Sequence, residues 1–170
     1  MRNRFGAVFS ALVVLAVTGP LAAAESLFAD DFEDMTANRW HVGGDGTVEV
    51  SSFAGSQALK LTKHGYALAA VRIDGQFTVE IEVGLAAESL EPGDACVAEA
   101  SADGGAVWMD VLRLGDNDDD NGVLEVGSAK LTLPGPMSTL VIQLRAEGDS
   151  NSDICWADEV RVTVDQTESP

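Results

Sequence analysis

Basic residues are scarce in this sequence, and histidine is almost absent. The chain holds 10 Lys and Arg against 28 Asp and Glu, which gives a formal net charge of −18 at pH 7, and His41 and His64 are its two histidines. Nucleic acids and anionic membranes are bound through Lys and Arg that neutralise phosphates, so this charge argues against both as partners. The charge itself has two interpretations, which are solubility and a surface that gathers divalent cations.

Motifs of known catalytic machinery are also missing. The sequence contains no Gly-x-Ser-x-Gly, no His-Glu-x-x-His and no phosphate-binding loop. Two carboxylates could hydrolyse a glycosidic bond, but among 28 acidic residues no particular pair stands out. We therefore expect a protein that is not an enzyme.

Long apolar runs are absent except at the start of the chain. There, Arg2 and Arg4 precede an apolar run over residues 5–17, and small residues lead up to Ala24. This is the pattern of a secretory signal peptide, and the run is shorter than the ~20 residues that span a bilayer; an uncleaved anchor is the alternative. We expect residues 1–24 to be a cleaved signal peptide, and the protein to be secreted or periplasmic without insertion into a membrane.

Cysteine is limited to Cys96 and Cys155. In an oxidising compartment these two are expected to form a disulfide, with two separate buried thiols as the alternative. The absence of a Cys-x-x-Cys motif and of any Cys/His cluster argues against a zinc or redox site.

Beyond the leader, apolar and polar residues alternate with a period of two, which is typical of β-strands. The alternation is strict over residues 77–83, which predicts a strand with one buried and one solvated face. Further alternating segments are residues 47–50, 58–61 and 140–145. More continuous apolar runs at 66–73 and 107–114 predict strands that are covered on both faces.

Segments rich in Gly, Pro, Asp and Asn separate these runs and predict turns. They are residues 43–46, 74–75, 91–94, 103–105, 116–122 and 133–136. Short strands at such regular spacing predict an all-β protein, a two-sheet antiparallel β-sandwich or a barrel. Residues 25–165 are expected to form this single domain, followed by a polar C-terminal tail over 166–170.

The last predicted strand, residues 154–164, carries a carboxylate on its apolar face. A period of two places five apolar residues on one side, with Asp158 among them: Ile154, Trp156, Val160, Val162 and Val164. A carboxylate is costly there unless a cation or several donors meet it. Asp158 is therefore either a metal ligand or turned towards water by a bulge near Ala157.

Several of these segments occur in an order that is found in secreted jelly-roll modules. They are residues 27–33, Trp40, Asp94 at the start of a strand, the turn 103–108 and residues 156–162. From about Ser26 to Val164 the chain resembles MAM-like and carbohydrate-binding-module-like β-sandwiches, and the Asp-Gly-Gly-x-x-Trp turn is the most telling piece. The resemblance implies a jelly roll whose function is binding.

The resemblance also implies a cofactor. In such modules an acidic residue of the opening segment and one of the closing strand often share a structural calcium ion. Carried over to this sequence, this points to Glu33, or Asp31 beside it, and to Asp158 as ligands. Calcium takes six to eight oxygen ligands, which carboxylates from both chain ends and backbone carbonyls would supply.

A second acidic segment, residues 116–122, begins like an EF-hand loop. From Asn117 it reads Asn-x-Asp-x-Asn-Gly, but Ser128 stands at position twelve, where an EF-hand needs a bidentate Glu. The EF-hand interpretation therefore fails, which leaves a looser calcium loop or a solvated turn.

Few aromatic residues are available to stack on a sugar ring. Trp108 and Trp156 lie in strand patterns and are expected in the core. The remaining candidates for ligand binding are Trp40 with His41, beside the glycine-rich loop, and Tyr66 with His64. Packing in the core or at a strand edge is the alternative for each of these four.

The sequence thus predicts a secreted, non-catalytic binding module with a glycan or an extracellular protein as its partner. A structural or adhesive envelope protein that acts by assembly is the alternative, and an unrecognised hydrolase is a third hypothesis.

Overall fold

The structure is a computed structural model that describes residues 24–74, 78–118, 122–133, 135 and 137–164. Apart from Ala24, the predicted signal peptide lies outside the described residues, as does the predicted tail over 166–170.

The described residues form eleven β-strands and one short 3₁₀ helix. In chain order they are β1 (Glu25–Asp30), β2 (His41–Gly43), β3 (Val48–Phe53), β4 (Ser56–Thr62), β5 (Tyr66–Asp74), β6 (Thr78–Glu88), β7 (Ala95–Ser101), β8 (Met109–Gly115), η1 (Asp116–Asp118), β9 (Glu125–Thr132), β10 (Met137–Glu147) and β11 (Ile154–Val164). The predicted all-β class is confirmed. Within the described part of the chain, no helix has the length and apolar character needed to cross a membrane.

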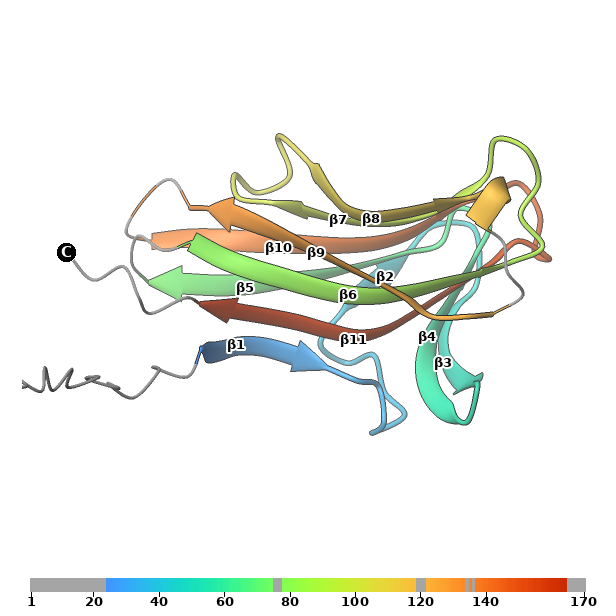
Figure 1. Ribbon diagram of the computed structural model, residues 1–170, viewed down its shortest axis with the longest axis horizontal. Coiled ribbons are helices and arrows are strands. Elements are labelled where there is room, and N and C mark those ends of the chain that lie inside the picture. Colours follow the sequence, from blue (N-terminus) through green and yellow to red (C-terminus); the bar gives the residue numbers. More distant parts are fainter. Residues whose placement is uncertain (1–23, 75–77, 119–121, 134, 136, 165–170) are drawn as a thin grey trace, which may run out of the picture.

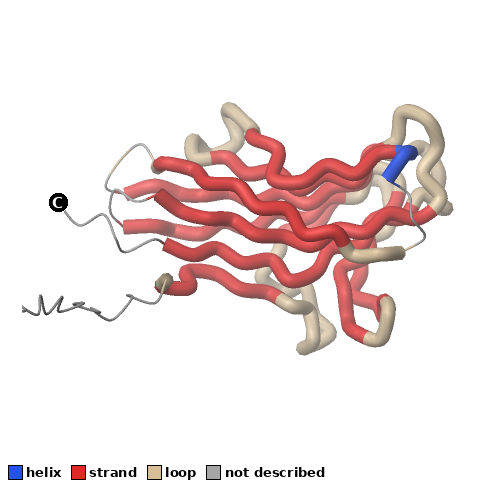
Figure 2. Tube along the Cα trace, in the orientation of Figure 1, coloured by secondary structure: helices blue, strands red, loops and turns tan. Residues whose placement is uncertain are grey.

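Two antiparallel sheets pack face to face, and most of their strands run along the long axis of the molecule, while the β3–β4 hairpin runs across it (Figures 1 and 2). Sheet A has the order β3-β4-β11-β6-β9, with β1 also paired to β11, and sheet B has the order β2-β5-β10-β7-β8. From β4 onward, successive strands lie in opposite sheets except for β7 and β8. This repeated crossing between layers is the connectivity of a jelly roll.

Strand β6 illustrates how the alternating pattern builds the sandwich. Val79, Ile81 and Val83 point towards the other sheet and are fully buried, whereas Glu80 and Glu82 point outward. Such inward residues from both sheets form the main core. The predicted strand with one buried and one solvated face is therefore confirmed over its described part, which begins at Thr78.

The two apolar runs that were predicted to be covered on both faces are not. In β5 only alternate residues are buried, because the outer face of sheet B opens to solvent. Strand β8 lies at the edge of sheet B, and Val107 just before it is 68% exposed. The strand that is buried along its whole length is β7.

Strand β11 changes its inward face halfway along. Cys155 and Ala157 are buried in the core in its first half, and Val160 and Val162 are buried there in its second half. Trp156 therefore faces away from the core, where it stacks on Phe53 in a small separate cluster with ring centroids 4.9 Å apart. The prediction that Trp156 is buried holds, but the prediction that it shares a face with the later valines is wrong.

A β-bulge causes this switch. The register of β11 with β6 shifts between Asp158 and Arg161, and Glu159 has a φ of 51°. The bulge adds one residue, so the residues that point inward change from odd-numbered to even-numbered ones. It also marks a change of partner, since β4 pairs with residues 154–157 and β1 pairs with β11 from Val160 onward.

The predicted disulfide is confirmed. Cys96 of β7 and Cys155 of β11 are joined by an S–S bond of 2.07 Å, which links the two sheets through the core. Cys96 lies opposite Ala146 in the register of β7 with β10. The bond therefore ties the centre of sheet B, near the end of β10, to sheet A.

Candidate functional site

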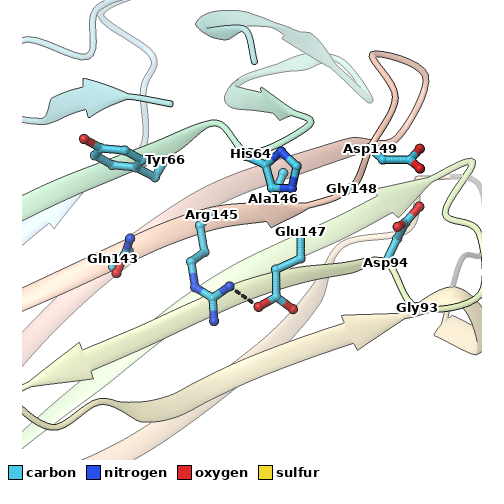
Figure 3. A pocket seen from close by; sticks show the side chains of 10 residues that line it. All are labelled: His64, Tyr66, Gly93, Asp94, Gln143, Arg145, Ala146, Glu147, Gly148 and Asp149. Atoms are coloured by element: carbon cyan, nitrogen blue, oxygen red, sulfur yellow. Dashed lines mark hydrogen bonds and ion pairs between the residues drawn. The ribbon is translucent and has the colours of Figure 1, made fainter. Parts of the chain in front are cut away.

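An open groove lies on the outer face of sheet B, over the ends of β5 and β10 (Figure 3). The outward residues of β10 form its floor, because the residues between them point into the core. The turns before β7 and after β10 form one end. The groove has a volume of 460 Å³ and is lined by His64, Tyr66, Gly93, Asp94, Gln143, Arg145, Ala146, Glu147, Gly148 and Asp149.

Tyr66 supplies the aromatic surface of the groove. It lies directly opposite Arg145 in the register of β5 with β10, so the two residues stand on the same face of sheet B. Its phenol leans over Gly43 of the edge strand β2, where an added Cβ would lie 2.4 Å from the hydroxyl oxygen. The absence of a side chain at Gly43 allows the ring to lie across β2, where it is half-buried.

A chain of ion pairs crosses the floor of the groove. Arg145 donates to Glu99 at 2.9 Å and also to Glu147, while Arg113 donates to Glu147 at 2.6 Å and to Asp110 at 3.1 Å. Burial by itself raises the pKa of Glu147, but hydrogen bonds from Arg113 and Arg145 outweigh it and hold that pKa below its ordinary value. Both guanidinium groups are thereby fixed in position by charge-assisted hydrogen bonds.

The end of the groove is built from two turns, each organised by a carboxylate. Asp94 accepts a hydrogen bond from the backbone N–H of Glu91 at 3.1 Å, within the turn that leads into β7. In the turn after β10, Asp153 is 1% exposed and accepts a hydrogen bond from the N–H of Ser150 at 2.7 Å. This second turn presents Asp149 to the groove (Figure 3).

Of the four ligand-binding candidates taken from the sequence, His64 and Tyr66 line this groove. His64 is exposed, and its Nδ1 lies 3.3 Å from a carboxylate oxygen of Asp45. His41 is exposed on β2 opposite Leu68, hence on the same face of sheet B, but it does not line the groove.

Trp40 is not available to a ligand, which corrects the expectation from its place beside a glycine-rich loop. It is 6% exposed, packs edge-on against Phe28 and beside Phe32, and donates its indole N–H to Asp30 at 2.9 Å. Its aromatic surface and its polar atom are both used inside the protein.

Trp108 is only half-buried, so its expected place in the core is not borne out. The turn before it is organised by Ser101 and Asp103, which hydrogen-bond to each other at 2.7 Å. Ser101 also accepts from the N–H of Gly105 at 2.8 Å, and Asp103 from that of Val107 at 2.9 Å. Hydrogen bonds from Ser101 and Val107 lower the pKa of Asp103. The Asp-Gly-Gly-x-x-Trp segment thus has a local structural role.

The three predicted calcium ligands lie around the bulge of β11. Asp158 remains 6% exposed, so the bulge does not turn it towards water. Burial raises the pKa of Asp158, and the negative charges of Glu159, Glu33 and Asp31 raise it further.

Glu33 reaches the neighbouring hairpin. It accepts hydrogen bonds from the Ser56 hydroxyl and from the N–H of Gln57 at 2.9 Å, and these two bonds lower its pKa. The donor set around Asp158 consists of carboxylates without His or Cys, which suits calcium rather than zinc. Among the described residues, however, no three His, Cys, Asp or Glu side chains converge closely enough to hold a metal ion.

The second acidic segment forms a local structure at its start. Residues 116–118 are the 3₁₀ helix η1, and Asp118 accepts a hydrogen bond from the N–H of Gly115 at 2.9 Å. Residues 119–121 of the predicted loop lie outside the described residues.

Sequence reasoning missed the polar residues of the groove. Gln143 and Arg145 stand at the outward positions of the predicted alternating segment 140–145, and this is the signal that was present; Glu147 lies two residues beyond it, at the end of β10. Nothing in the sequence placed β10 between β5 and β7, which is what brings Tyr66 beside Arg145.

No family model matches the sequence, and no curated protein matches it in sequence. Solved structures do match the fold. The CBM22-1 xylan-binding domain from Paenibacillus barcinonensis Xyn10C is similar with a TM-score of 0.58 and 17% identity, over 86% of this chain and 98% of that domain. The CBM22-1–GH10 modules of a Clostridium thermocellum xylanase, complexed with xylohexaose, match with a TM-score of 0.63 and 13% identity, over 85% of this chain and 29% of that one.

A third similar structure is TmCBM61 in complex with β-1,4-galactotriose, with a TM-score of 0.53 and 14% identity, over 78% of this chain and 92% of that one. At these identities the similarity concerns the fold. It supports the resemblance to carbohydrate-binding modules, while the resemblance to MAM-like modules stays a prediction. The chain has the two-sheet β-sandwich fold that carbohydrate-binding modules also adopt.

Proposed function

We propose that this protein binds a glycan chain, without chemically altering it, in the groove on the outer face of sheet B. The observation that carries the proposal is an open groove that the half-buried Tyr66 lines together with Arg145 and Gln143. Similarity to xylan-binding and galactotriose-bound modules supports it. A secreted or periplasmic location, predicted from the leader, agrees with such a role.

The chemistry of the groove suits a sugar. A pyranose ring presents C–H groups on its faces and hydroxyls around its rim, so it is recognised by one aromatic face and several polar groups at fixed positions. Tyr66 provides the aromatic surface. Gln143 offers both donors and acceptors, and the carboxylates of Asp94 and Asp149 accept hydrogen bonds from hydroxyls.

The same residues argue against hydrolysis. A general acid for glycoside cleavage needs a carboxyl group that remains protonated near the working pH. Glu147 is the carboxylate at the centre of the groove, and its two arginine partners lower its pKa. The floor of the groove therefore holds a fixed ion-pair network, which suits recognition.

Calorimetric titration with xylohexaose and β-1,4-galactotriose tests the proposal. We expect binding of at least one of them by the wild-type protein, and at least about ten-fold weaker binding by Tyr66→Ala, since an aromatic contact contributes roughly 0.5–1.5 kcal/mol beyond the area it buries. His41→Ala is the matched control, because His41 is exposed on the same face but outside the groove.

Undiminished binding by Tyr66→Ala would show that the groove is not the binding site. No binding of either glycan by the wild type would refute the proposed function. Self-association in light scattering, in place of glycan binding, would favour the alternative of an assembling envelope protein.

We further propose that Asp158 binds a structural calcium ion together with Asp31 and Glu33. The supporting observation is a buried carboxylate at the place where β1, β4 and β11 meet, with its pKa raised by burial and by neighbouring negative charges. A divalent cation would offset this repulsion and tie the first strand to the last. Because the side chains do not already form a closed ligand cage, binding would draw them together and recruit backbone carbonyls.

A further inference from the structure

We infer that the groove selects uncharged glycans and excludes chains that carry carboxylate or sulfate groups on the sugars it holds. This inference rests on the proposed function and narrows the ligand class of the same site.

The cations of the groove are already paired with carboxylates of the protein. Arg145 is the permanently charged cation among the lining residues, and it is already engaged by Glu99 and Glu147. The neighbouring Arg113 is engaged by Glu147 and Asp110. Two guanidinium groups thus face three carboxylates, so neither retains the uncompensated charge that would pair with an acidic sugar.

Two carboxylates that have no cationic partner among the described residues lie at the end of the groove. Asp94 comes from the turn before β7 and Asp149 from the turn after β10, and Figure 3 shows both carboxylates at the same end, from opposite sides. Within the described part of the chain neither has a cationic partner. Ionised carboxylates accept hydrogen bonds but donate none, so they suit the hydroxyls of a neutral sugar and repel an anionic one.

The repulsion between these carboxylates and an acidic sugar is large enough to measure. A sugar held in the groove lies within the screening distance of about 8 Å at physiological ionic strength, so the charges of Asp94 and Asp149 are only partly screened. Two such repulsions at about 6 Å in a water-like medium weaken binding of an anionic sugar about ten-fold at low salt, where screening is weak, and less at physiological salt; the formal net charge of −18 acts in the same direction.

The experiment compares neutral and acidic probes of equal length: xylohexaose against a xylohexaose that carries glucuronic acid, and this acidic probe against the same oligosaccharide with its carboxyl group reduced to a neutral alcohol. Calorimetry is done at low and at high salt. We expect the acidic probes to bind about ten-fold or more weakly at low salt, with a smaller difference at high salt. Asp149→Lys should narrow the low-salt difference or reverse it.

Glu49→Lys is the matched control for this variant. It changes the net charge by the same amount on an exposed residue of β3 in sheet A, and so it separates a local from a global charge effect. Equal affinity for neutral and acidic probes at low salt, or equal effects of the two variants, would overturn the inference and leave the proposed function standing. If no probe binds, the proposed function fails and the inference fails with it.

Discussion

Breaking the Cys96–Cys155 disulfide should remove about half of the free energy of unfolding of a typical domain. The bond closes a loop with a sequence separation of 59, and the loss of chain entropy in the unfolded state for such a loop corresponds to about 4 kcal/mol. Domains of this size are stable by roughly 5–15 kcal/mol. Replacing both cysteines by alanine should therefore lower the melting temperature by about 8–16 °C, at roughly 2–4 °C per kcal/mol.

Urea unfolding followed by tryptophan fluorescence measures this loss, since Trp40 and Trp156 are buried. The single variants Cys96→Ala and Cys155→Ala are the controls. Either one breaks the bond, so each should cost nearly as much as the double variant. A double variant within about 1 kcal/mol of the wild type would refute the reasoning from loop entropy. Two free thiols in the wild type, detected by mass spectrometry, would refute the bond itself.

Three further predictions concern the groove and the calcium proposal. Gly43→Ala places a Cβ 2.4 Å from the Tyr66 hydroxyl, so it should weaken glycan binding several-fold by calorimetry. Gly135→Ala, where no atom lies within 4 Å of the added Cβ and φ is not in the left-handed region, should leave the affinity unchanged. The pKa of Glu147 is lower in the folded protein than its ordinary value of 4.5, so the ionised side chain stabilises the fold above that value, and this stabilisation is lost as the pH falls through the folded value. Glu147→Gln should lower the free energy of unfolding by about 1 kcal/mol at neutral pH and flatten its dependence on acid pH in urea titrations. The pKa of Asp158 is instead raised above 3.8, so its charge destabilises the fold as the pH rises through the raised value. In chelator, Asp158→Asn should therefore melt at a higher temperature than the wild type. Calcium at 100 times its Kd should stabilise the wild type by about 2.7 kcal/mol and leave the variant unchanged. A wild-type melting curve that neither chelator nor calcium changes would refute the calcium proposal.

The fold class could be predicted from the sequence because it depends on local patterns. Strict alternation in β6, and the turn-forming residues between the strands, are properties of neighbouring residues. The predicted cover over both faces of β5 was wrong, because small and apolar residues such as Ala70 also occur at its exposed positions. A bulge in β11 was one of two alternatives, and the structure has one without turning Asp158 towards water. A single inserted residue reverses every side chain beyond it, so the sequence could not show that Trp156 and the later valines point to opposite sides.

The groove could be predicted only in part, because it depends on which strands become neighbours. Tyr66 and His64 stood out as an aromatic and a titratable residue beside a glycine. The only signal from Arg145 and Glu147 was that they are polar residues at alternating positions, and they matter because Glu99 and Arg113 of neighbouring strands pair with them. Trp40 looked exposed in the sequence, and packing between Phe28 and Phe32 made it part of the core.

An NMR titration of the isotope-labelled protein with xylohexaose, or with β-1,4-galactotriose, tests the glycan-binding groove most directly. We predict that the amide signals that shift belong to the outer face of sheet B, around Tyr66, Gln143 and Arg145, and that those of the opposite face, such as Glu80 and Glu82 of β6, stay in place. Shifts confined to sheet A, or a spectrum that neither sugar changes, would contradict it.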